Sequence, residues 1–253
     1  MGQFLDDWFA TDAPFAECPD LVCLAEVDGG RSLVAAAFRE AVIDHLVGVE
    51  LVERLIGKPT ALAAQAARLP KSPRQMSADF GEILATEFVD QCTDYRVPVR
   101  RLRFKADREL PMPGDDIVAL AVDGSPRLLK GEAKSRVAMN ASTVEGADKA
   151  LNRDDGRPKP ETLAFLSGRL RDGDMDDLAE VVEGFLDGQL DEQIEHLLFA
   201  VSANDSRDLL KPYAASARAN IRRRVAGVVI ADHSDFIRGT FDALRGELVA
   251  RGA

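Results

Sequence analysis

Two apolar segments separated by a short turn constrain the fold of this chain more than any other feature. Residues 116–123 read Asp-Ile-Val-Ala-Leu-Ala-Val-Asp, and residues 127–134 read Arg-Leu-Leu-Lys-Gly-Glu-Ala-Lys. Short aliphatic runs bounded by turn residues are typical of β-strands. The segment 124–126, Gly-Ser-Pro, favours a turn between them. We therefore predict a β-hairpin, which places both segments in one sheet.

The remaining segments predict helices and strands on both sides of this hairpin. The segment 31–57 has apolar residues at helical spacing and reads as one long helix or two, and residues 60–69 are compatible with a helix. A further helix is predicted to begin near Ser77, a good N-cap. After the hairpin, helices are predicted at 143–152, 160–170, 175–187, 209–223 and 234–251. Further strands are predicted at 97–105, 196–202 and 224–232.

This order of elements predicts the fold class. Helices come first, then a group of strands, then mixed helices and strands, so we expect an α/β fold with a mixed central sheet flanked by helices. Residues 1–70 are expected to form a mainly helical N-terminal region. Residues 71–253 are expected to form the core, with helices and strands at its C-terminal end.

Composition and charge restrict the class of protein. The chain has 253 residues, no apolar run of membrane-spanning length and an acidic N-terminus, so we expect neither a transmembrane helix nor a signal peptide. Its three cysteines form no CxxC pair, which is typical of a reduced, cytoplasmic protein. The net charge of −11 repels phosphate at long range. A nucleic-acid enzyme of this charge needs a local basic patch, bound cations or a partner that delivers its substrate.

Three charged residues of the hairpin form the main candidate site. Glu132 and Lys134 point to the same side of their strand because side chains alternate along a strand. Asp116 begins the neighbouring strand, where hairpin pairing can bring its carboxylate beside Glu132. Two carboxylates suit a magnesium ion, which prefers oxygen ligands, and the ion would activate a water beside a phosphodiester. Lys134 can orient that water and offset negative charge in the transition state.

Two alternatives remain open for these residues. The first alternative is a solvent-exposed strand face without a catalytic role, on which Lys130, Glu132 and Lys134 form a row of charges. Such charges are energetically costly if the strand is buried. The other concerns the first acid, because Asp115 competes with Asp116. We prefer Asp116, which directly precedes the apolar strand.

The succession of a helix with Phe-Gly-Glu, a strand, Gly-Asp-Asp-hydrophobic and Gly-Glu-Ala-Lys resembles the core of the PD-(D/E)xK nucleases over residues 77–135. Holliday-junction resolvases and restriction-type nucleases share that core. The fuller pattern is similar to the HamA-like nuclease subunit of the Hachiman antiphage system. The resemblance implies that Asp116 and Glu132 are metal ligands and that Lys134 is the catalytic lysine.

The same resemblance places a further acid on the preceding helix, where Glu82 matches. Gly81 beside it would permit close approach of the helix to a metal site. On a helical wheel, however, Glu87 falls within the arc of apolar residues and Glu82 lies nearer its edge. We prefer Glu82 as a third ligand and catalytic acid and keep Glu87 as its competitor.

The densest basic stretch lies just before the hairpin. On the predicted strand 97–105, Arg101, Arg103 and Lys105 share one face and could bind phosphates of a nucleic acid. An edge strand guarded by charge is the equally weighted alternative.

These observations lead to one functional expectation. We expect a DNA endonuclease dependent on Mg²⁺ or Mn²⁺. By resemblance, it would be the effector of an antiphage complex with a helicase partner and no membrane association. The alternatives are a non-catalytic nucleic-acid-binding or scaffold subunit that retains the fold, and a restriction enzyme subunit.

Overall fold

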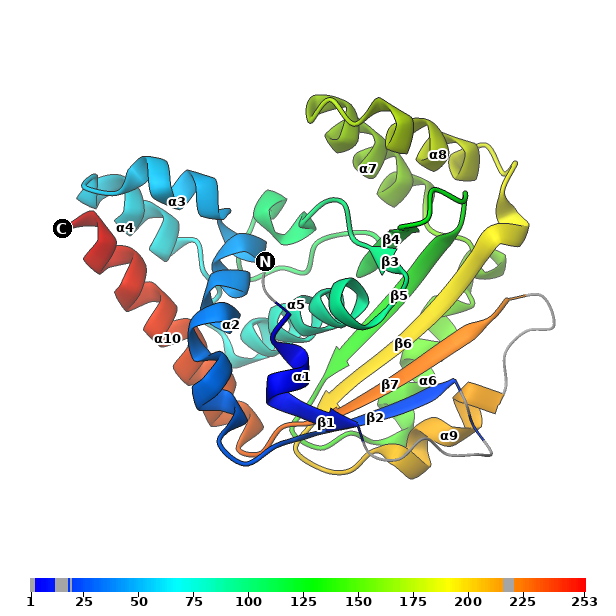
Figure 1. The fold of residues 1–253 in the computed structure, drawn as a ribbon, viewed down its shortest axis with the longest axis horizontal. Coiled ribbons are helices and arrows are strands. Elements are labelled where there is room, and N and C mark those ends of the chain that lie inside the picture. The colour runs from blue at the N-terminus through cyan, green and yellow to red at the C-terminus, as the bar shows by residue number, and fades with distance from the viewer. Residues whose placement is uncertain (1–2, 12–17, 19, 216–220) are drawn as a thin grey trace.

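The computed structural model describes residues 3–11, 18, 20–215 and 221–253 (Figure 1). Within these residues, seven strands form one mixed sheet in the order β1-β2-β7-β6-β5-β4-β3. The strands are β1 Phe9–Thr11, β2 Leu21–Glu26, β3 Tyr95–Arg96, β4 Ile117–Ala121, β5 Leu128–Ser135, β6 Ile194–Ser202 and β7 Arg223–Val229. The predicted α/β class with a mixed sheet flanked by helices is confirmed.

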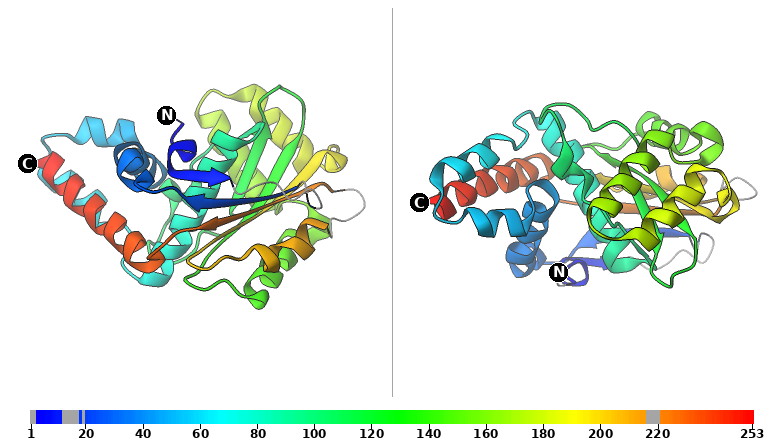
Figure 2. Two further views of the ribbon diagram at one scale, coloured as in Figure 1. Left: turned by 60° about the horizontal axis from the view of Figure 1, so that its bottom comes forward. Right: turned by 90° about the horizontal axis from the view of Figure 1, so that it is seen from above.

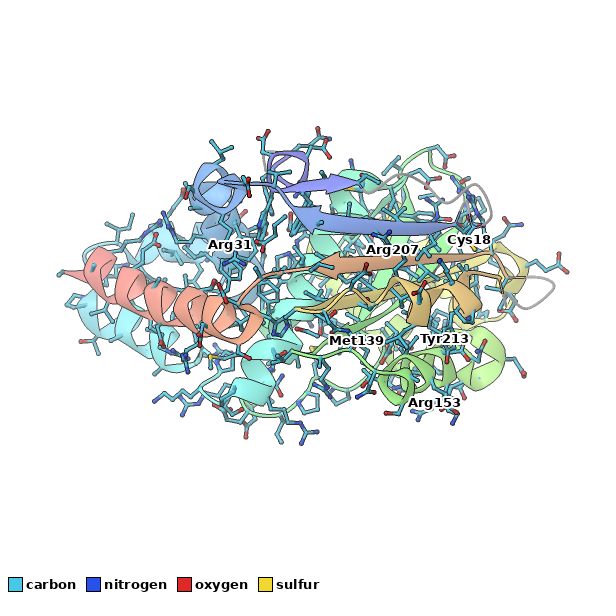
Figure 3. All side chains as sticks on the ribbon, turned by 90° about the horizontal axis from the view of Figure 1, so that it is seen from below. Cys18, Arg31, Met139, Arg153, Arg207 and Tyr213 are labelled. Carbon is cyan, nitrogen blue, oxygen red and sulfur yellow. The ribbon has the colours of Figure 1, made fainter. Side chains whose placement is uncertain are left out.

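Helices lie on both faces of this sheet (Figures 1 and 2). The α-helices are α1 Leu5–Trp8, α2 Gly30–Leu46, α3 Val49–Leu55, α4 Pro59–Ala67, α5 Pro73–Cys92, α6 Ala141–Leu151, α7 Pro160–Asp172, α8 Asp176–Leu186, α9 Arg207–Ala215 and α10 His233–Gly252. Helix α5 packs on one face together with α1, α2 and α10. The opposite face is covered by α6 and α9 at one part and by α7 and α8 at another. Figure 3 views the side of α6 and α9, where Met139 and Tyr213 belong to the same apolar cluster.

The predicted hairpin is present, and its register matters for the site. Strands β4 and β5 pair antiparallel, with Ile117 opposite Gly131. A Cβ atom on Gly131 would lie 2.9 Å from the Cβ of Ile117, so only glycine fits there. Strand β5 continues to Ser135 and stays paired with β6 on its other side. Residues 132–135 therefore extend beyond the end of β4 and have one free edge.

The two faces of β5 have different partners. Leu129 and Ala133 contact the core under α5, whereas Leu128 contacts the core under α7 and α8. This alternation puts Glu132 and Lys134 on the face opposite α5.

The predicted strand 97–105 is wrong. Strand β3 covers only Tyr95–Arg96, and residues Arg101–Phe104 form a short 3₁₀ helix, η1. Pro98 has no N–H for a strand ladder, and the N–H of Val97 donates to the Asp90 carboxylate at 2.8 Å. Local side-chain bonds thus replace strand pairing in this segment.

Two helix boundaries also differ from the sequence analysis. Helix α5 begins at Pro73 rather than near Ser77, because Ser72 is the N-cap that accepts from the N–H of Gln75 and proline suits the first helical position. The predicted helix 209–223 corresponds to α9. Residues 216–220 lie outside the described residues, and Arg223 already belongs to β7.

The N-terminal region was expected to be mainly helical, and α1 to α4 lie there. It also supplies two strands that the sequence analysis did not predict, β1 and β2. Strand β2 pairs parallel to β7, so this region extends the central sheet. In the part of the chain that the structure describes, no helix combines the length and apolar character needed to span a bilayer.

Candidate active site at the open end of the hairpin

The position of Asp116 follows from the unequal lengths of β4 and β5. Asp116 directly precedes β4 and, by continuation of the register, faces Glu132. Beyond the end of β4, the N–H of Ala133 has no strand partner on that side and donates to Asp116 Oδ2 at 3.0 Å. This bond satisfies the free strand edge and fixes the carboxylate at the sheet end.

Glu132 and Lys134 lie on the same side of β5, as the alternation predicted. Lys134 Nζ donates to Glu132 Oε1 and, at 3.3 Å, to the carbonyl of Ala133. The side chains of Glu132 and Lys134 are only 16% and 26% exposed. Both are therefore partly desolvated while still reachable from solvent.

Lys130 argues against the alternative of an exposed charged ladder. Its ammonium is buried and donates to the carbonyl oxygens of Leu151 at 3.1 Å and Arg157 at 2.8 Å. It also lies 3.7 Å from an Asp115 carboxylate oxygen. The three charges of β5 thus have different surroundings, and Lys130 holds the segment after α6 against the strand.

Asp115 has a structural role that separates it from Asp116. Its carboxylate is buried and accepts the N–H of Lys159 at 2.7 Å, while its own N–H donates to Thr162 Oγ1 at 2.9 Å. These bonds tie the loop before β4 to the start of α7. Asp116 therefore lies at the open strand edge, and its choice over Asp115 as a metal ligand stays a prediction.

Helix α5 brings Glu82 toward the same place. A Cβ atom on Gly81 would lie 2.9 Å from the Cβ of Ser135, so glycine allows α5 to approach the end of β5 closely. Glu82 lines a cavity together with Asp115 and Asp116. Its Oε1 atom lies 3.3 Å from Arg101 Nε and has no hydrogen-bond partner within the described part of the chain.

Glu87 is directed elsewhere on the same helix. Its carboxylate lies 2.8 Å from His45 Nε2 and accepts from Gln91 at 2.7 Å. The wheel correctly indicated that Glu87 points into the protein interior, where it is buried. Its bonds to His45 and Gln91 account for that burial, and of the two competing glutamates Glu82 shares a cavity with Asp116.

The carboxyl groups of the site disfavour one another's charge. Burial and the neighbouring charge of Asp116 raise the pKa of Glu132 to about 7, against an opposing effect of Lys134. Burial raises the pKa of Glu82 to about 8, and Asp116 adds to this while Arg101 opposes it. Carboxylates held together in a desolvated place favour a bound cation or protons.

The donor set fits a magnesium ion held by few protein ligands. Among the described residues, no group of three or more His, Cys, Asp or Glu side chains is arranged to hold a metal ion. Magnesium is commonly bound by one or two carboxylates and keeps several waters. Asp116 and Glu132 meet that requirement. Glu82 was expected as a third ligand, but within the ranges that the structure describes it does not form a three-residue metal-binding group with them.

The basic residues expected to bind nucleic acid do not share a face. Arg103 bonds to the Asp44 carboxylate and carbonyl, and Lys105 donates to the Asp79 carboxylate at 2.9 Å and 3.0 Å. Arg101 faces Glu82 and donates to the carbonyl oxygens of residues 112 and 113. The common strand face on which that prediction rested is absent, and only Arg101 lies beside Asp116.

The supporting roles of Lys130, Lys159 and Thr162 were not predicted from the sequence. The role of Lys130 could have been inferred from the sequence. Lys130 and Glu132 are two residues apart on the strand, so they point to the same side of a mostly apolar segment. The other two come from a loop and a helix far along the chain, and no local pattern indicates their contact with Asp115.

Comparison with known proteins places these residues in a family context. The family model described as HamA matches residues 4–244, a range that includes every residue of the candidate site. The chain is also 25% identical over 182 residues to the Hachiman protein HamA of Bacillus cereus. That alignment spans 71% of this chain and 65% of the relative, so it covers slightly less than two thirds of the relative's length.

Proposed function

The chain belongs to the HamA family, and from this membership together with the site at the end of β5 we propose that it is a metal-dependent DNA endonuclease. We place it in the PD-(D/E)xK nuclease superfamily and in Hachiman antiphage defence. The observation that carries the proposal is the juxtaposition of Asp116, Glu132 and Lys134 at the open end of the β4–β5 hairpin.

The chemistry assigns a role to each of the three residues. Bound Mg²⁺ or Mn²⁺ would supply Lewis acidity toward a phosphodiester and lower the pKa of a bound water. Asp116 and Glu132 would hold the ion, and the bond from the N–H of Ala133 fixes the Asp116 carboxylate for this task. The ammonium of Lys134 reaches Glu132, so it lies where it can orient a water and offset charge on a phosphate oxygen.

The charge of the chain bears on how DNA reaches this site. With a net charge of −11, the protein does not attract a polyanion at long range. Arg103 and Lys105, which were candidates for a DNA-binding face, are paired with acids of the same chain. We therefore propose that a helicase subunit of the same defence system delivers the DNA.

Plasmid nicking in Mg²⁺ tests this function, with and without the proposed helicase partner. We expect the wild type to nick DNA and the variants Glu132→Ala and Lys134→Ala to lose that activity. Glu145 and Lys149 form an exposed glutamate–lysine pair on α6, so Glu145→Ala and Lys149→Ala are matched controls that should retain it. Equal nicking by the wild type and both site variants would contradict the proposal. No nicking under any condition would favour the non-catalytic binding or scaffold subunit.

A further inference from the structure

A cavity of about 240 Å³ opens directly beside the candidate active site. It lies between the segment 97–101, the loop before β4 and helix α7, and Asp116 lines both the cavity and the active site. Most of its wall is apolar. The apolar lining residues are Val97, Val99, Met112, Pro113, Val118, Phe165 and Leu166.

One aromatic wall of the cavity is held in place by its neighbours. The rings of Phe165 and Phe104 lie edge to face with centroids 5.5 Å apart. The guanidinium of Arg169 lies 5.3 Å from the Phe104 ring and 5.9 Å from that of Phe165. The cavity thus presents a supported aromatic surface.

Arg101 supplies an unsatisfied donor at the polar end of the cavity. Its side chain is only 12% exposed, its Nε atom lies 3.3 Å from Glu82 Oε1, and its Nη1 atom has no hydrogen-bond partner among the described residues. Its Nη2 atom donates to the carbonyl oxygens of Met112 and Pro113. Because a buried donor that is left unpaired is unfavourable, Nη1 favours an acceptor brought by a ligand.

The combination fits one class of ligand. A nucleotide joins an uncharged planar base, which suits apolar and aromatic walls, to acceptor groups that suit a guanidinium. The apolar wall continues to Asp116, where the reacting phosphate would lie under the proposed function. The acids Glu82, Asp115, Asp116 and Glu161 also line the cavity, so its interior suits an uncharged base better than an acidic peptide or a phosphate group.

We propose that this cavity receives an unpaired base of the DNA strand next to the phosphate that is cleaved, an inference that rests on the proposed nuclease function. A base stacked and paired in a duplex cannot enter such a cavity, so the substrate is single-stranded DNA or DNA with an extruded base. A helicase partner would produce such a strand.

Methionine methyl NMR tests this proposal without any cleavage. The chain has five methionines, and of those in the described residues Met112 lines the cavity. Met76 and Met139 are buried elsewhere, and Met175 is an exposed control. Protein labelled with ¹³C-methyl methionine, in EDTA, is titrated with a thymidine hexanucleotide and with an abasic hexanucleotide of the same length. We expect the ring current of a bound base to shift the Met112 signal most, and only with the base-bearing strand.

A blocking variant sharpens the test. Val99→Phe fills the cavity and should abolish the Met112 shift, whereas Val122→Phe adds the same group at an exposed turn and should preserve it. Unchanged Met76 and Met139 signals report that each variant is folded. A Met112 signal that does not move, or moves equally with the abasic strand, overturns the base pocket. Because no cleavage is measured, that result is distinct from failure of the nicking experiment, which would overturn the nuclease instead.

Discussion

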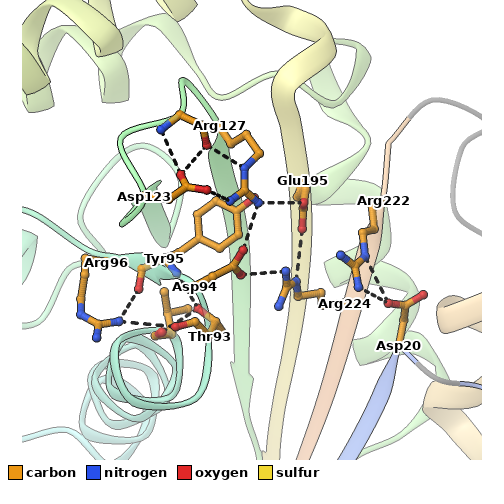
Figure 4. Close-up of polar contacts among 12 residues, drawn as sticks. Asp20, Thr93, Asp94, Tyr95, Arg96, Asp123, Arg127, Glu195, Arg222 and Arg224 are labelled. Carbon is orange, nitrogen blue, oxygen red and sulfur yellow. Dashed lines mark hydrogen bonds and ion pairs between the residues drawn. The ribbon is translucent and has the colours of Figure 1, made fainter.

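Charged residues cluster at both ends of strand β5, but the charges are paired at one end and unbalanced at the other. At the amino end, around Arg127, acids and arginines alternate in a network that spans the starts of β5, β6 and β7 (Figure 4). At the carboxyl end, Lys134 pairs with Glu132, Asp116 accepts the N–H of Ala133, and Glu82 has only a loose ion pair with Arg101. Arginines thus balance the acids at the amino end, whereas carboxylates outnumber their basic partners at the carboxyl end.

The network at the amino end is closed by direct bonds. Arg127 donates to Asp94 and Asp123, both at 3.0 Å, and Arg224 donates to Asp94 at 2.9 Å and Glu195 at 3.2 Å. The ring of Tyr95 lies 5.2 Å from one guanidinium and 5.6 Å from the other. Although burial alone would raise it, the pKa of Asp94 is lowered by these arginines.

The pKa values at the carboxyl end shift the other way. Burial and the charge of Asp116 raise the pKa of Glu132 to about 7. Charges that stabilise a fold are paired with one another, whereas charges kept for a cation or a substrate remain in excess until it binds. We propose that this contrast within one strand separates residues that stabilise the fold from residues that serve the proposed chemistry.

Replacement of one aspartate at each end of β4 gives the largest expected effect. Asp116→Asn removes a carboxylate proposed to hold the metal, and we expect nicking to fall by at least about 10²-fold, as when a group that stabilises a transition state is lost. Asp123→Asn makes the same change in the compensated network and should leave nicking unchanged. Initial rates at saturating Mg²⁺ measure both, and equal losses would contradict the contrast.

Glu82→Gln should stabilise the metal-free protein. Its folded-state pKa of about 8 lies above the ordinary value, so the folded protein binds the proton more tightly and wild-type stability falls as pH rises from about 4.5 to about 8. Glutamine is neutral throughout. We expect the variant to gain about 1–3 kcal/mol in free energy of unfolding at pH 7.

Urea denaturation in EDTA at pH 5 and pH 8 measures this difference. The gap between Glu82→Gln and the wild type should be small at pH 5 and widen toward pH 8. The exposed control Glu145→Gln should show no such widening, because Glu145 lies at the surface beside Lys149. A wild type that gains stability over this range relative to Glu82→Gln would contradict the excess of carboxylate charge.

The sequence predicts contacts between residues that are close along the chain better than contacts between distant segments. The hairpin and the side shared by Glu132 and Lys134 follow from local alternation, and the structure has both. The place of Asp116 beside the strand end also followed from hairpin pairing. Short-range patterns were sufficient because these residues lie within one supersecondary unit.

Contacts between distant segments were not predictable in the same way. Arg103 and Lys105 read as one strand face, but Asp44 and Asp79 come from helices elsewhere in the chain and pair with them. Strand β2 was not predicted because its place in the sheet depends on pairing with β7, about 200 residues further along. The amino-end network likewise joins Asp94 to Arg224, so no local pattern reveals that its charges are compensated.

The smallest expected effect is on stability, and it tests whether the ion pairs at the amino end of β5 contribute more where they are more buried. Arg224→Met keeps the apolar stem but removes the charge, which leaves Asp94 and the largely buried Glu195 with fewer partners. The cost of breaking such a half-buried ion pair lies between the costs for exposed and for buried pairs. We therefore expect a loss of about 1–2 kcal/mol in free energy of unfolding. Arg222→Met, two positions earlier in the chain, breaks an exposed pair with Asp20 and should cost less than about 0.5 kcal/mol. Urea denaturation compares the two. Equal losses would mean that the network adds nothing beyond surface pairs, and a loss of nicking in Arg224→Met at full stability would mean that this end also serves the chemistry.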